Sequence, residues 1–221
     1  ALSSSAFSLQ RAGKLDLAQA AYEEALLHAG RAGDAGTMAT TRLNLAAIAK
    51  SRGDLAKTIE HLEASVDMGR RSGRRATLRQ ALLNLANLDL FIGRVAKAEG
   101  AIKELAGERE ELAPSARAQL LGLEADLTAR RGAPDRAFEK CLECAAAYEA
   151  LNRPVDAAEA RLEAVFFALG GVDDGAPARP LAELERLVRM ASEALVGADR
   201  HGAARVMAQA RVDQHERSGW A

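Results

Sequence analysis

The sequence predicts an all-α fold, an α-solenoid of about five and a half antiparallel helix hairpins. First, the stretch Leu43-Asn44-Leu45-Ala46 recurs forty residues later as Leu83-Asn84-Leu85-Ala86. Second, five glycines are spaced 40, 40, 39 and 39 residues apart, namely Gly13, Gly53, Gly93, Gly132 and Gly171. Third, each of these turn glycines stands between two segments with a helical apolar pattern. Recurrence at a fixed distance indicates a repeat array.

Small and apolar residues hold the same register around the turn glycines. Seven residues before them stand Ala6, Ala46, Ala86, Ala125 and Ala164. A small residue at a fixed point lets two helix axes approach to about 8–10 Å. The buried stripe of the second helix follows at three positions: Ala18, Thr58, Ala98 and Ala137; Tyr22, Leu62, Ile102 and Cys141; Ala25, Ser65, Leu105 and Cys144. The glycine itself supplies the turn, where a Cβ is unfavourable.

The first three repeats are expected at residues 1–36, 37–75 and 76–113. Their helices are predicted near Leu2–Arg11 and Leu15–His28, Met38–Ser51 and Leu55–Arg71, then Ala76–Ile92 and Val95–Leu112. The glycine-containing segment 30–36 is expected to be a loose connection. It leads to Thr37, a residue type that favours the N-cap position.

The later repeats are expected at 114–152 and 153–197, followed by a final helix at 198–218. Pro114, Pro134 and Pro154 each suit the first turn of a helix, with ends predicted near Arg131 and Leu169 for the first and third. Residues 170–177 form the clearest loop. If eight residues are inserted there, the helix 181–196 returns to the register of the repeat, with Leu184, Val188 and Ala191 on the buried stripe. The spacing of 48 residues from Gly171 to Gly219, one period of 40 plus eight, agrees with this insertion. The helix 200–217 either caps the array or is the first half of a truncated repeat.

Composition excludes several functional classes. The formal net charge is −1, which gives no general attraction to nucleic acid or to an anionic membrane. No apolar run is long enough to span a membrane. Two cysteines do not make a disulfide framework, so a reducing cytoplasm is the expected location. The chain begins at Ala1 and contains far more arginine than lysine, which suggests a piece of a longer bacterial protein.

The motif resembles the tetratricopeptide repeat (TPR) family. Gly53-Asp54-Leu55 matches the inter-helix turn of that family, and Ala18, Tyr22, Ala25 and Leu26 match its second-helix signature. The period near 40 is longer than the usual ~34 residues and looks like the variant in kinesin light chains and bacterial regulatory proteins. The resemblance implies a right-handed superhelix whose first helices line a concave groove for peptides or partner proteins.

The candidate groove residues lie on one face of the first helices. Asn44 and Asn84 lead the set, because asparagine is a mediocre helix former and its repetition suggests a role. Alternatively, each asparagine bonds the neighbouring helix and only fixes geometry, or the face is an ordinary solvated surface. The full predicted set is Asn44, Lys50, Gln80, Asn84, Asn87, Gln119, Asp126 and Arg130, with Thr40, Ala47 and Leu90 on the same face. The regular lysines of chaperone-binding repeats are missing, so binding of a chaperone tail is not expected.

Other residue clusters have simpler interpretations. Cys141 and Cys144 occupy stripe positions, so they are expected to be small buried hydrophobes and not a metal or redox pair. The basic run 70–75 ends a predicted helix, where arginine is favoured by the helix dipole, so a solvated loop is expected; the alternative is a site for an acidic partner or a phosphate. Glu124 and Glu163 replace Leu45 and Leu85, so either that helix is rotated or the two line a local acidic pocket.

These observations favour a non-catalytic protein- or peptide-binding scaffold within a bacterial signalling or transcription regulator. No nucleophile, phosphate loop or paired-carboxylate motif indicates an enzyme, and no cofactor or metal is expected. Direct binding of nucleic acid or membrane is not expected either. The alternative is a structural module that self-assembles into homo-oligomers, because unpaired terminal repeats of a solenoid expose apolar surface.

Overall fold

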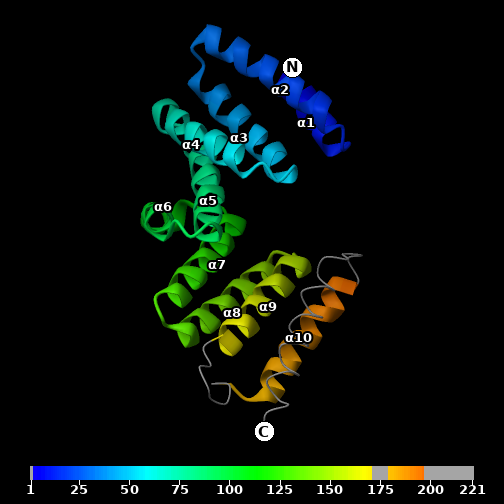
Figure 1. Ribbon diagram of the computed structural model, residues 1–221, viewed down its shortest axis with the longest axis vertical. Helices are drawn as coiled ribbons and strands as arrows, with labels where there is room; N and C mark the ends of the chain where they lie inside the picture. The colour runs from blue at the N-terminus through cyan, green and yellow to red at the C-terminus, as the bar shows by residue number, and fades with distance from the viewer. Residues whose placement is uncertain (1, 171–178, 197–221) are drawn as a thin grey trace. The chain divides into compact units, whose positions relative to one another are not determined.

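The computed structural model describes residues 2–170 and 179–196, and all regular elements in these ranges are helical (Figure 1). Their order is α1 (Leu2–Arg11), α2 (Leu15–Ala32), α3 (Ala35–Ser51), α4 (Leu55–Ser72), α5 (Arg75–Phe91), α6 (Val95–Gly107), the 3-10 helix η1 (Arg109–Glu111), α7 (Pro114–Arg130), α8 (Pro134–Ala150), α9 (Pro154–Gly170) and α10 (Leu181–Val196). The predicted all-α class is confirmed. The predicted helix at 200–217 lies outside the described residues.

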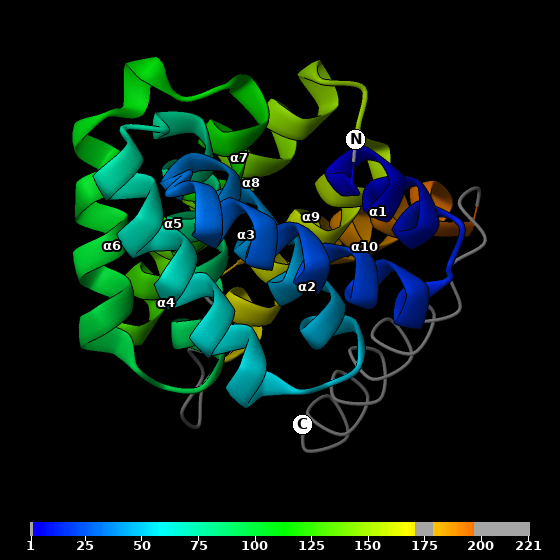
Figure 2. The same ribbon diagram turned by 90° about the horizontal axis from the view of Figure 1, so that it is seen from above.

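The chain divides into two compact units, Ala1–Gly107 and Glu108–Ala221. The first unit contains α1 to α6, and the second begins just before η1 and contains α7 to α10. The prediction of one continuous solenoid over residues 1–221 stays a prediction. In each unit, consecutive helices pack against one another as hairpins, and the hairpins then pack against their neighbours in sequence. In the first unit, α3 lies between α1 and α5 (Figure 2).

The turn glycines adopt the conformation that the sequence predicts for them. The φ angles of Gly13, Gly53, Gly93 and Gly132 lie between +73° and +80°, in the left-handed region that favours glycine. Gly171 lies outside the described residues. Each left-handed glycine reverses the chain within about three residues, which is why the two helices of a hairpin can pack closely along their length.

The connection between the first two hairpins is shorter than predicted, and Thr37 is not the N-cap. Helix α2 continues to Ala32 and α3 begins at Ala35, so most of the expected loose segment is helical. Asp34 is the N-cap, and its carboxylate accepts hydrogen bonds from the Thr37 amide at 2.9 Å and the Thr37 hydroxyl at 2.6 Å. Left-handed Gly33 supplies the turn. The carboxylate cap outcompetes the hydroxyl because it is charged and faces the helix N-terminus.

The second helix of the third hairpin is also shorter than predicted. Helix α6 ends at Gly107, and the residues expected to continue it form η1. Glycine is a poor helix former, which explains an end at that position. Leu112 remains buried in the turn that leads to Pro114, so the segment is still anchored by its apolar residue.

The predicted register is confirmed by burial. The small-residue sites Ala6, Ala46, Ala86, Ala125 and Ala164 are at most 2% exposed. All twelve stripe residues of the second helices are buried as well. In the first unit, Tyr22 of α2 packs with Leu45 and Ile48 of α3, so the core of one hairpin continues into the next. In α10, Leu184 and Ala191 are buried and Val188 packs beside them. The register predicted for α10 is therefore confirmed, while residues 171–177 of the predicted loop lie outside the described residues.

Candidate functional site

The predicted binding face in the first unit is formed by neighbouring helices. The Oγ1 atoms of Thr40 on α3 and Thr77 on α5 lie 3.4 Å apart, which brings the two first helices side by side. Residues three and four apart lie on one side of a helix. Thr40 and Asn44 therefore share a side of α3, and Gln80, Asn84 and Asn87 share a side of α5. We call these five residues the asparagine face.

The amides of the asparagine face retain most of their hydrogen-bonding capacity. Asn84 and Asn87 are exposed and Asn44 is half-buried. Gln80 Nε2 donates to Asn84 Oδ1 at 3.2 Å, within α5. The structure gives Asn44 and Asn87 no side-chain hydrogen bond to any described residue. No hydrogen bond within the described residues therefore supports the alternative that the asparagines fix the helix geometry by bonding a neighbouring helix.

The end of this face differs from the prediction at one residue. Lys50 of α3 is exposed and forms no ion pair with a described residue, but Leu90 is only 1% exposed and belongs to the core. Phe91 is exposed instead, at 73%. Lys50 and Leu90 each stand three residues before a turn glycine, at the border between the buried and the exposed side of the helix. A leucine at this position turns into the core, whereas a lysine keeps its charge in water.

The two charged residues predicted for the binding face of the second unit bond each other. On α7, Arg130 Nε donates to Asp126 Oδ1 at 2.7 Å, and Arg130 Nη2 donates to Asp126 Oδ2 at 3.3 Å. The two charges of this bidentate pair face each other and are only partly exposed. Gln119 is half-buried and has no side-chain hydrogen bond within the described residues. The charged part of the predicted face is therefore less available to a partner than the asparagine face.

The two glutamates that replace leucines have different surroundings. Glu124 is mostly buried and receives hydrogen bonds from Arg109 and from Lys140, the latter at 3.3 Å. Glu163 on α9 is solvent-accessible and forms no ion pair with a described residue. It lies among atoms of its own and neighbouring helices, and this partial loss of hydration, with repulsion from Asp126 and Glu159, raises its pKa to about 7. Glu124 is thus neutralised by two cations, whereas Glu163 has acidic neighbours and no cationic partner among the described residues. The acidic pocket itself stays a prediction.

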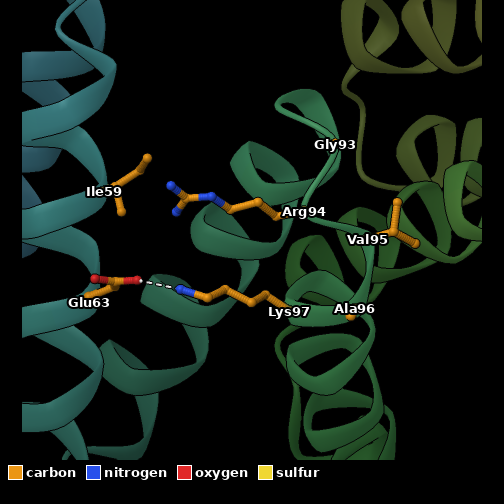
Figure 3. Close-up of a pocket in the computed structure, with 7 residues that line it drawn as sticks. All are labelled: Ile59, Glu63, Gly93, Arg94, Val95, Ala96 and Lys97. Carbon is orange, nitrogen blue, oxygen red and sulfur yellow. Dashed lines mark hydrogen bonds and ion pairs between the residues drawn. The ribbon is translucent and has the colours of Figure 1, made fainter.

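A notch at the start of α6 was not predicted from the sequence. It has a volume of about 700 Å³ and lies between α4 and the turn that contains Gly93 (Figure 3). Lys97 Nζ donates to Glu63 Oε1 at 3.2 Å across it, and the Arg94 side chain extends toward Ile59 (Figure 3). Arg94 also lies near buried Asp89, whose pKa is raised by burial. Because its cations and carboxylates already face one another, the notch offers little charge to a ligand.

The cysteines are core residues, as the sequence predicts. Cys141 and Cys144 are free and buried. Cys144 Sγ donates to the Ala118 carbonyl at 3.2 Å, and burial raises the pKa of the Cys144 thiol to about 12. Burial raises the pKa of Cys141 as well. Within residues 2–170 and 179–196 there is no group of three or more His, Cys, Asp or Glu that could hold a metal ion.

The basic run at the end of α4 is partly paired. Arg70 Nη2 donates to Glu104 Oε2 at 2.6 Å, and Arg71 Nη1 lies 3.9 Å from Asp67 Oδ2. Both arginines are exposed in the last turn of α4, where a positive charge is favoured by the helix dipole. No helix in the described ranges has the length and apolar character needed to cross a membrane.

Solved structures with a similar arrangement of helices contain TPR-like repeats. One consists of nearly identical repeats assigned to a kinesin light chain of Podosopora anserina. It has a TM-score of 0.61 and 14% identity, and the alignment covers 90% of this chain and 95% of that chain. A single-residue variant of the same repeats has a TM-score of 0.56 and 15% identity, with coverages of 98% and 94%. Neither a protein-family model nor a curated protein sequence matches the chain.

These similarities define the class of protein by its fold. Each of its two units consists of TPR-like helix hairpins of the all-α solenoid class. The resemblance in the sequence is therefore confirmed at the level of fold.

Proposed function

We propose that the chain is a non-catalytic scaffold that binds a protein or peptide partner through the asparagine face of α3 and α5. The observation that carries the proposal is the spare hydrogen-bonding capacity of Asn44, Asn84 and Asn87. Each primary amide offers donors and an acceptor. Amides spaced along neighbouring first helices can therefore bond the backbone of an extended peptide, whose own N–H and C=O groups otherwise lose water on binding.

The surrounding residues define the kind of segment that would bind. Thr40 and Gln80 are uncharged, and Lys50 contributes one free positive charge at the end of the face. Exposed Phe91 and Phe7 offer apolar contact in the same unit. The partner segment is accordingly an extended peptide of low net charge that carries apolar side chains. The finer setting, the recruiting part of a bacterial signalling or transcription regulator in the cytoplasm, belongs to the same proposal and rests on the composition of the chain.

The proposal is tested with peptides selected by display on the purified chain. The double exchange Asn44→Ala and Asn84→Ala should weaken binding of the selected peptides by about tenfold, because each lost hydrogen bond contributes about 0.5–1.5 kcal/mol. Helicity by circular dichroism should stay the same. The control exchange Lys103→Ala, at an exposed site on α6, should leave affinity unchanged. Equal affinity of the double variant and the wild type would reject this face as the binding site.

Self-assembly is the second candidate, and exposed leucines on α2 favour it. Leu17 is 58% exposed and Leu27 is 54% exposed, although both are large apolar residues. Size-exclusion chromatography with light scattering separates the two functions. A monomer across the accessible concentration range removes the assembly function, whereas a discrete oligomer that Leu17→Gln or Leu27→Gln dissociates supports it.

A further inference from the structure

A cavity in the second unit brings three helices together at the end of α8. Its volume is about 370 Å³. It is lined by Glu149 at the end of α8, by the turn 152–154, by Arg161 of α9, and by Met190, Glu193 and Ala194 of α10. Ligand pockets typically measure about 300–1,000 Å³, so this cavity suits a small molecule.

Arg161 is an unusual residue for the lining of this cavity. Its side chain is only 8% exposed. Ten residues before the turn glycine, the same register position holds Leu43 and Leu83 in the second and third repeats. A leucine there would fill the space without desolvating a charge, whereas a buried guanidinium is unfavourable unless it is paired and hydrogen-bonded. Packing alone therefore does not explain the arginine.

The cavity keeps donors of Arg161 available. The structure assigns Arg161 one hydrogen bond, from Nη2 to Glu149 Oε1. A guanidinium carries five N–H donors, so several remain at the cavity wall. The neighbouring Arg153 differs, because its Nε and Nη2 both donate to Asp156, at 2.8 and 2.7 Å, and its guanidinium stacks over Tyr148. Arg161 is thus the cation that can accept a further anionic group.

The lining also carries a separate negative charge. Glu193 lines the same cavity from α10 and forms no ion pair with a described residue. A ligand with only a carboxylate would meet Glu149 and Glu193, and a ligand with only an ammonium would meet Arg161 and Arg153. A ligand with both charges can place its carboxylate on Arg161 and its ammonium on Glu193, while Met190 and Ala194 contact its apolar part.

From this arrangement we infer that the cavity is a binding site for a small zwitterion of the α-amino-acid class. The site lies in the second unit, away from the asparagine face of the first unit in sequence, and does not depend on the proposed peptide binding. Its chemistry has two parts, a buried guanidinium for the carboxylate and an unpaired glutamate for the ammonium.

The test measures thermal unfolding and calorimetric binding of the whole chain with free L-amino acids, first in pools and then singly. At least one amino acid should raise the unfolding midpoint in a saturable way. Its N-acetyl derivative, which lacks the ammonium, and its amide, which lacks the carboxylate, should each bind at least about tenfold more weakly, as expected for the loss of a charged hydrogen bond. Dipeptides distinguish a free amino acid from a peptide with both termini.

Two variants and one control locate the site. Arg161→Leu should remain folded, because leucine occupies the same position in two other repeats, and should lose the ligand-induced shift. Glu193→Gln should weaken binding about tenfold or more. The control Glu185→Gln changes an exposed glutamate of α10 outside the cavity and should bind normally. The inference is overturned if no amino acid gives a saturable shift, or if Arg161→Leu binds as the wild type does.

Discussion

Oδ1 of Asp89 lies 4.0 Å from Nη1 of Arg94 and accepts no hydrogen bond, although Asp89 is only 1% exposed. Four residues before the turn glycine, the equivalent positions hold Ala49 in the second repeat and Thr128 in the fourth. Thr128 satisfies its hydroxyl by donating to the Glu124 carbonyl at 2.6 Å. Asp89 has no such bond, and burial raises its pKa despite the nearby cations Lys97 and Arg94. The negative charge of Glu63 opposes those cations.

Asp89→Ala is therefore expected to stabilise the chain by about 1–2 kcal/mol near neutral pH, because it removes a buried acceptor without a partner. The carboxyl pKa is higher in the folded than in the unfolded chain, so the folded state binds the proton more tightly. The free energy of unfolding of the wild type should consequently fall as pH rises above about 4, and the advantage of the variant should grow over that range and then level off. Urea unfolding at several pH values measures both effects.

Asp89→Asn provides the matched comparison, because it keeps the shape of the side chain and removes its titration. Its unfolding free energy should show less of the fall with pH seen in the wild type. If the wild type and both variants show the same pH dependence, Asp89 is ionised without penalty and the interpretation is wrong.

The small-residue register predicts a second, larger effect. Ala86 is fully buried at the crossing of the third hairpin, so Ala86→Leu should destabilise the chain by about 1–3 kcal/mol through overpacking. Ala47→Leu introduces the same side chain at an exposed site of α3 and should change stability little. Chemical denaturation of the two variants gives the comparison. Equal denaturation midpoints of the two variants would show that the hairpin accommodates a leucine at position 86, contrary to the tight packing around Ala86.

The repeat made the fold predictable from sequence, because its determinants are local and recur. A left-handed glycine, an alanine seven residues earlier and a stripe after it appear in nearly every hairpin, so an error in one is corrected by the others. The ends of helices were less predictable, because short-range competition decides them. At the start of α3, Asp34 and Thr37 are both capping residue types, and only the structure shows that the carboxylate is the cap.

The charged parts of the candidate sites were the least predictable. Glu124 is neutralised by Arg109 and Lys140, and Arg161 donates one hydrogen bond to Glu149, across turns that have no local signature. The sequence did indicate that Glu124 and Glu163 depart from the leucines of the repeat. It contained no information on which of them would meet a cation, because that depends on residues 15 or more positions away in a neighbouring helix or turn.

The two cysteines are expected to be chemically inert in the folded chain. Both are buried, and the raised pKa of Cys144, about 12, leaves almost no thiolate near pH 8. A thiol-reactive disulfide reagent should therefore label neither cysteine in native buffer and both in denaturant. Rapid labelling in native buffer would show that the hairpin of α7 and α8 opens readily.

Glu163 is expected to titrate near neutral pH. Its pKa of about 7 reflects partial loss of hydration first and repulsion from Asp126 and Glu159 second. Because the folded-state pKa exceeds the ordinary value of about 4.3, the ionised form is disfavoured in the folded chain, and stability should fall as pH rises from about 4.5 to about 7. Glu163→Gln should remove this fall.

Since the side chain is solvent-accessible, the effect on the unfolding midpoint is expected to be small, and carbon-13 NMR of the Glu163 carboxyl is the direct measurement. Asp126→Asn should lower the titration midpoint of Glu163 by removing a neighbouring negative charge. A midpoint near 4.3 in the wild type would mean that water screens Glu163 fully and that Asp126 and Glu159 have no electrostatic effect on it.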